Sequence, residues 1–129
     1  MPTYGVIFTK QQADQDYGLP LESIPIPAET FRLLLNQTNN YIMFRIENGN
    51  LFVLDNNRNL IYPQIDSNIQ PTDECIVYSL SVIDQLLGSS GIPGINVNVE
   101  RRSSVLSVTY GDKTMETGAN CPPYCPEQD

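Results

Sequence analysis

The sequence contains no histidine and no tryptophan, and it has only two lysines. The absence of histidine removes the commonest general base, the commonest metal ligand and the side chain that titrates near neutral pH. No apolar run approaches the roughly 20 residues that a membrane-spanning helix needs. The first residues lack the basic segment that opens a secretory signal. We therefore expect a cytoplasmic protein that does not enter a membrane.

Positive charge is also scarce. Seven basic residues oppose 15 acidic ones, which gives a net charge of −8. This charge repels phosphate, so we expect no binding to nucleic acid or to an anionic membrane surface. Charged residues make up 17% of the chain, less than the roughly 25% of an average soluble domain. A surface with few charges associates readily, so self-association as a homodimer is expected.

The chain is long enough for one domain with a hydrophobic core. It has 129 residues, of which 40% are hydrophobic, and such a length suits a single domain. We expect a globular domain over residues 1–111. Residues 112–129 are acidic, contain prolines and cysteines, and have few aliphatic side chains. They are expected to form a C-terminal tail, because such a segment buries too little apolar surface to offset the entropy of ordering it.

The pattern of hydrophobic residues predicts an α+β fold. The expected fold is a mostly antiparallel sheet of five or six strands, a meander plus a hairpin, with one or two helices packed on one face. Alternation and β-branched residues predict the strands, and the meander is marked by Asn48-Gly49, the strongest short hairpin signal. The predicted strands are residues 3–9, 41–47, 51–54, 59–62, 95–99 and 105–110.

Helices are expected in two places. Residues 28–37 follow a proline and place apolar side chains on one stripe, which predicts a short helix. Residues 73–87 fit both a helical stripe and a strand alternation, and the capping residues favour a helix from Ser81 onward. Residues 10–27 are expected to be polar and then extended, and residues 64–72 and 88–94 to be loops.

The three cysteines are Cys75, Cys121 and Cys125, and the last two enclose two prolines and a tyrosine. A polyproline helix would hold the Cα atoms of Cys121 and Cys125 about 12 Å apart. A disulfide requires less than about 7 Å, so the pair can close only if the chain turns. Three alternatives follow: inert thiols, a disulfide within the tail, or a redox or metal-binding role.

No cofactor, metal site or catalytic group can be assigned from the residues. A structural zinc site needs four ligands, and one chain offers only two nearby thiolates. Residues 55–59 resemble the first half of a calcium loop, but position six is Leu60 and not glycine, so a hairpin turn is the better interpretation. Without histidine, no Ser-His or Cys-His pair can be built.

Three residues are candidates for partner contacts. Arg101 and Arg102 form the only basic pair, and they are expected either on a solvated hairpin turn or against an acidic partner. Tyr124 is the large side chain of the cysteine segment. The leading hypothesis is a non-enzymatic binding or assembly module, and the alternative is a small redox or metal-binding protein that uses the tail cysteines.

Overall fold

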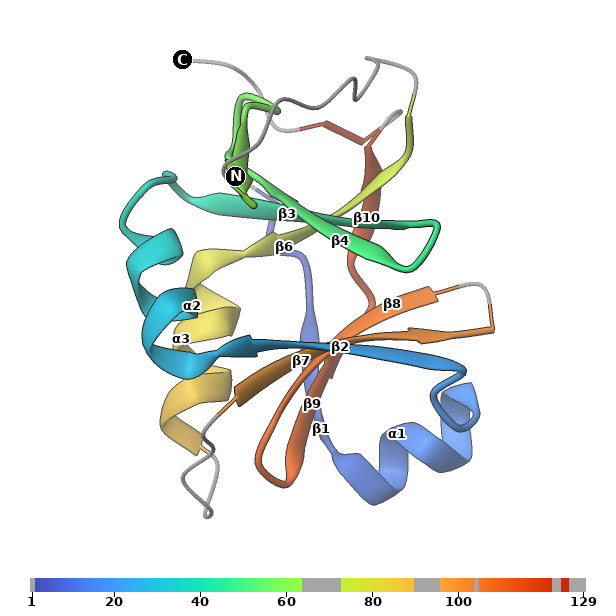
Figure 1. Ribbon diagram of the computed structural model, residues 1–129. Helices are drawn as coiled ribbons and strands as arrows, with labels where there is room; N and C mark the ends of the chain where they lie inside the picture. The colour runs from blue at the N-terminus through green and yellow to red at the C-terminus, as the bar shows by residue number, and fades with distance from the viewer. Residues whose placement is uncertain (1, 64–72, 90–95, 104, 122–123, 126–129) are drawn as a thin grey trace.

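The computed structural model describes residues 2–63, 73–89, 96–103, 105–121 and 124–125. These residues form two antiparallel five-stranded sheets and three helices, which confirms the α+β class (Figure 1). The strands divide between two sheets and do not share a single sheet. The expected loop at residues 64–72 lies outside the described residues, as does most of the expected loop at 88–94.

The first sheet has the order β1-β9-β8-β7-β2, so its last strand in chain order, β9, pairs with its first, β1. Its strands are β1 (Val6–Thr9), β9 (Lys113–Glu116), β8 (Val105–Tyr110), β7 (Asn96–Arg102) and β2 (Glu22–Pro27). The second sheet has the order β10-β6-β3-β4-β5. Its strands are β10 (Ala119–Cys121), β6 (Cys75–Ser79), β3 (Tyr41–Glu47), β4 (Asn50–Leu54) and β5 (Leu60–Tyr62).

The described helices are α1 (Lys10–Tyr17), α2 (Ala28–Leu35) and α3 (Leu80–Ser89). Helices α2 and α3 lie together along one side of the stacked sheets, and α1 lies beneath the first sheet (Figure 1). None of the helices in the described part of the chain is long and apolar enough to cross a membrane.

Helix α1 was not predicted, because its sequence shows no apolar stripe and buries only Ala13 completely. The hydroxyl of Thr9 caps it by accepting a hydrogen bond from the backbone N–H of Gln12 at 3.1 Å. The ambiguous segment 73–87 proves to contain both elements, since strand β6 ends at Ser79 and α3 begins at Leu80.

The main core fills the space between the two sheets. Alternate side chains from both sheets meet there, and α2 and α3 add their apolar stripes; the fully buried members include Ile26, Phe31, Ile42, Phe44, Tyr78, Ile83, Leu86, Val97, Val99 and Met115. The hydroxyl of Tyr78 donates to the carbonyl of Leu106 at 2.7 Å. This bond connects the second sheet to the first across the core.

A smaller apolar cluster covers the opposite face of the second sheet. Its buried members are Tyr41, Met43, Leu54, Cys75, Val77 and Cys121. Because side chains alternate along a strand, β6 supplies both clusters, and all five of its residues are buried. The second sheet is therefore buried on both faces along its central strands.

The turn between β3 and β4 has the backbone geometry that its sequence predicts. Asn48 has φ 53° and Gly49 has φ 78°. Both central residues of a type I′ turn need positive φ, and Asn-Gly is the pair that adopts it at the lowest cost.

The C-terminal segment differs from the expected tail. Strand β9 lies between β1 and β8, and β10 forms an edge of the second sheet. Composition concealed this role, because only Met115 of β9 faces the main core while Thr114 and Glu116 are buried among polar groups. Backbone pairing on both sides of β9, with Met115 in the core, orders a segment that its aliphatic content alone would leave loose.

The crossing from β9 to β10 depends on Gly118. A Cβ atom at this position would lie 2.5 Å from Cγ2 of Ile76 and 2.9 Å from the carbonyl oxygen of Val77. Real Cβ atoms do not approach other atoms so closely, and a backbone oxygen in a paired strand cannot move aside easily. Only glycine therefore lets the chain pass over β6 at this distance.

We predict that Gly118→Ala lowers the free energy of unfolding by about 1–3 kcal/mol, the usual effect of overpacking a filled site. Gly88→Ala is the matched control, because Gly88 lies in α3 and a Cβ atom added there would meet no atom within 4 Å. Alanine there should stabilise the helix by up to about 1 kcal/mol. Chemical denaturation of both variants measures the difference, and equal effects would contradict the close approach at Gly118.

Candidate functional site

Two of the three cysteines lie directly opposite each other on paired strands. Cys75 of β6 and Cys121 of β10 are register partners, and both are fully buried. A disulfide joins Cys121 to Cys125, with their Cα atoms 4.6 Å apart. The two Cα atoms are therefore close enough for the bond, and not the roughly 12 Å apart that a polyproline helix would give. The backbone N–H of Tyr124 donates to the carbonyl of Asn120 at 2.8 Å, which holds Tyr124 beside β10.

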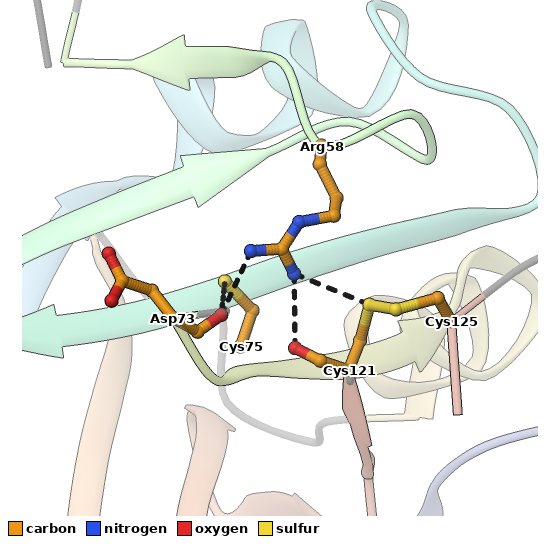
Figure 2. Close-up of a disulfide and its surroundings, with 5 residues drawn as sticks. All are labelled: Arg58, Asp73, Cys75, Cys121 and Cys125. Atoms are coloured by element: carbon orange, nitrogen blue, oxygen red, sulfur yellow. Dashed lines mark hydrogen bonds between the residues drawn. A yellow bond between two sulfur atoms is a disulfide. The ribbon is translucent and has the colours of Figure 1, made fainter. Parts of the chain in front are cut away.

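Arg58 holds the disulfide from the opposite edge of the second sheet. It lies in the turn between β4 and β5 with φ 65°. Its Nη1 donates to the carbonyl of Cys121 at 3.0 Å and lies 3.3 Å from Sγ of the same residue (Figure 2). Its Nη2 donates to the carbonyl of Asp73 at 2.8 Å. Two backbone carbonyls thus fix the guanidinium beside the sulfur.

The turn that presents Arg58 is built by Asp55. One carboxylate oxygen of Asp55 accepts from the backbone N–H groups of Asn57 and Asn59, both at 2.9 Å. This is the turn chemistry that the sequence predicts for residues 55–59.

Burial and nearby positive charges act in opposite directions on the pKa of the free Cys75 thiol. Burial raises the pKa of Cys75, while the positive charges of Arg58 and Arg45 act in the opposite direction without cancelling the rise. The Cys75 sulfur lies 3.9 Å from the carbonyl oxygen of Asp73, the same carbonyl that Arg58 contacts (Figure 2). Cys75 and Cys121 therefore share one cation.

A second polar cluster lies beneath α1. Arg102 is fully buried, so the expectation that it sits on a solvated turn is wrong. Its Nη1 contacts a carboxylate oxygen of Asp14 at 2.5 Å and the carbonyl of Gly18 at 2.7 Å. The arginine thereby fastens the C-terminal part of α1 to the sheet.

Two glutamates of the first sheet also lie within ion-pair distance of Arg102. Nη2 of Arg102 lies 3.2 Å from Oε1 of Glu100, and its Nε lies 3.3 Å from Oε1 of Glu116. The hydroxyl of Ser107 accepts from the same Nε at 3.0 Å. At the other end of α1, Lys10 lies 3.8 Å from Glu100.

Glu116 is the least favourably placed carboxylate of this cluster. Burial raises its pKa, and the nearby Ser107 and Arg102 only partly oppose the rise. Its side chain is fully buried between the sheet and α1. The cluster is therefore a buried network of ion pairs in which the ionised form of Glu116 is disfavoured by burial.

The structure separates the three predicted partner contacts. Arg101 is half-exposed and pairs with Glu22 at 3.3 Å, whereas its neighbour Arg102 points to the opposite face of β7. Tyr124 is 64% exposed and lies beside the disulfide. An open cavity of about 200 Å³ lies at the end of the sandwich between Arg45 and Arg101, with apolar walls that include Leu106.

The sequence points to the three cysteines but not to Arg58 or to the partners of Arg102. The available signal for Arg58 was its place in a tight turn among asparagines, which does not reveal a contact with residues about 63 positions later. Within the described ranges, no group of three or more cysteines and carboxylates could hold a metal ion.

Comparison of the chain with protein-family models, with curated proteins and with solved structures finds no match. The residues and their geometry are therefore the basis for assigning a function.

We predict that Glu116→Gln raises the melting temperature at neutral pH. The native pKa of Glu116 lies above its unfolded value. Its contribution to stability is therefore present at pH values below the unfolded pKa and lost as the pH rises through the native one. The gain in Tm should be about 2–8 °C, the shift produced by about 1 kcal/mol.

This gain should shrink as the pH falls toward the ordinary glutamate pKa of about 4.3. Glu47→Gln, at the exposed end of β3, makes the same charge change at the surface and serves as the control. Thermal melts of both variants across this range provide the measurement. A loss of stability in Glu116→Gln at neutral pH would show that the ionised form is the favoured one.

Proposed function

We propose that the protein is a non-enzymatic binding or assembly module that forms a homodimer through residues 19–21. The observation behind this proposal is the exposure of two neighbouring leucines. Leu19 is 71% exposed and Leu21 is 65% exposed, and both lie just before edge strand β2. Exposed apolar side chains that gather at one place are typical of interaction surfaces.

The charges beside this segment suit a second copy of the same chain. Glu22 and Arg101 form an ion pair next to Leu21, whose backbone N–H donates to the carbonyl of Arg101 at 2.8 Å. In a two-fold contact the same patch meets itself, which allows Glu22 of one copy to pair with Arg101 of the other. This opposite-charge pair supports association despite the net charge of −8.

The rest of β2 favours a short contact. Pro25 and Pro27 have no backbone N–H, and an edge strand with prolines resists continuous pairing with another strand. The proposed dimer therefore uses the leucine side chains at one end of β2.

We also propose a cytoplasmic location. The chain has three cysteines, an odd number, and Cys75 is a free buried thiol. Secreted domains of this size that depend on disulfides usually contain an even number of paired cysteines.

Light scattering tests the dimer. The wild-type chain should have twice the 14.5 kDa mass of one copy at micromolar concentration. The double variant Leu19→Ser, Leu21→Ser should have the mass of a single copy and should still unfold cooperatively on heating. Leu33→Ser is the matched control, because Leu33 is 59% exposed but lies on α2.

The control variant should remain a dimer. A wild-type protein that stays monomeric at high concentration would overturn the homodimer. Dissociation of the Leu33→Ser variant alone would move the interface to α2.

A further inference from the structure

The register of β6 and β10 gives Cys121 a second possible disulfide partner. Opposite residues in antiparallel strands have Cα atoms about 4.5–5.5 Å apart, with side chains on the same face. This separation lies inside the range in which two cysteines can be bridged. Cys75 and Cys121 are such a pair, and both belong to the same buried cluster. Cys121 can therefore be bridged to Cys75 as well as to Cys125.

We propose that Cys121 exchanges its disulfide between Cys125 and Cys75. The thiol of Cys75 loses its proton, and its sulfur attacks Sγ of Cys121. The Cys121–Cys125 bond breaks, and its electron pair leaves on Sγ of Cys125, which takes up a proton. The step exchanges one disulfide for another, so it needs no external oxidant or reductant.

The two cysteines that carry the free thiol before and after the exchange differ in solvent exposure. Cys75 and Cys121 are fully buried, whereas Cys125 is exposed next to Tyr124. While the Cys121–Cys125 disulfide is in place, the free thiol is therefore that of Cys75, inside the protein. After exchange, the free thiol is at the surface, where it can form a mixed disulfide with a thiol of another molecule.

Arg58 is the positioning residue for the exchange. Its guanidinium lies 3.3 Å from Sγ of Cys121 and is held by the carbonyls of Cys121 and Asp73. Figure 2 shows it above both Cys75 and Cys121. A fixed cation beside the sulfurs stabilises the negative charge that passes between them.

The exchange does not depend on the proposed dimer. The leucines of residues 19–21 lie just before β2 of the first sheet, whereas Cys75 and Cys121 belong to strands of the second sheet. A failed dimer test leaves the exchange standing, and a failed exchange test leaves the dimer standing.

Trapping with N-ethylmaleimide tests the exchange in the native full-length chain. The oxidised protein is held with the reagent at mildly alkaline pH, then acidified, digested and mapped by mass spectrometry. The expected product has the reagent on Cys125 and a disulfide between Cys75 and Cys121, because only the exchanged form presents an accessible thiol. Label on Cys75 with the Cys121–Cys125 bond intact, or no label, would overturn the proposal.

Two variants that each lack one cysteine test the Cys75–Cys121 disulfide directly. On treatment with the thiol oxidant diamide, Cys125→Ser should form the Cys75–Cys121 disulfide. Cys75→Ser is the matched control and should keep the Cys121–Cys125 disulfide without taking up label. Two free thiols in oxidised Cys125→Ser would show that Cys75 and Cys121 cannot bond.

The role of Arg58 has its own measurement. Arg58→Met should slow the labelling of Cys125 about tenfold, the effect expected from losing one charge-assisted hydrogen bond. Arg58→Lys keeps the charge and should restore part of the rate. An unchanged rate in Arg58→Met would remove Arg58 from the exchange, whereas label on Cys75 in that variant would show that the cluster has opened.

Discussion

The close passage of Gly118 over β6 is the constraint on which both polar sites depend. Before this residue the chain is the β9 strand of the first sheet, and after it the chain is the β10 strand of the second. The crossing places Glu116 beneath α1 and Cys121 opposite Cys75. Since β9 also pairs with β1 at the other end of the chain, the first sheet is complete only when both ends have met. Such distant pairing slows folding relative to local contacts.

Much of the strand pattern could be predicted from the sequence, because it depends on neighbouring residues. Asn48-Gly49 specifies its own turn, and the alternation around it marks β3 and β4. Helix α1 escaped prediction because ion pairs attach it to the sheet and no apolar stripe does. Strand β9 escaped because its order comes from two flanking strands that lie far away in sequence. Neither the ion pairs of α1 nor the distant strands that flank β9 can be predicted from local composition.

The sites were less predictable than the fold for a related reason. The sequence shows that Cys121 and Cys125 are close in the chain, but only the sheet register brings Cys75 to them. Arg102 follows an arginine near a turn, which is typical of a solvated position. It is buried because β7 extends beneath α1, where the carboxylates of Asp14 and two glutamates lie around its guanidinium. The burial of a charged residue in a strand can be predicted only when its ion-pair partners from other elements are known.

The attachment of α1 has a consequence for local motion. The helix buries one side chain completely, Ala13. Its other anchors include the ion pairs of Asp14 and Lys10 with the sheet and the ring contact of Tyr17 with Phe8. An element with so little buried apolar surface opens at a lower free energy than the sheets that it covers. We therefore expect its backbone amides to exchange with solvent deuterium before those of β7 and β8. Each such opening would admit water to Arg102 and Glu116 while the core between the sheets stays closed.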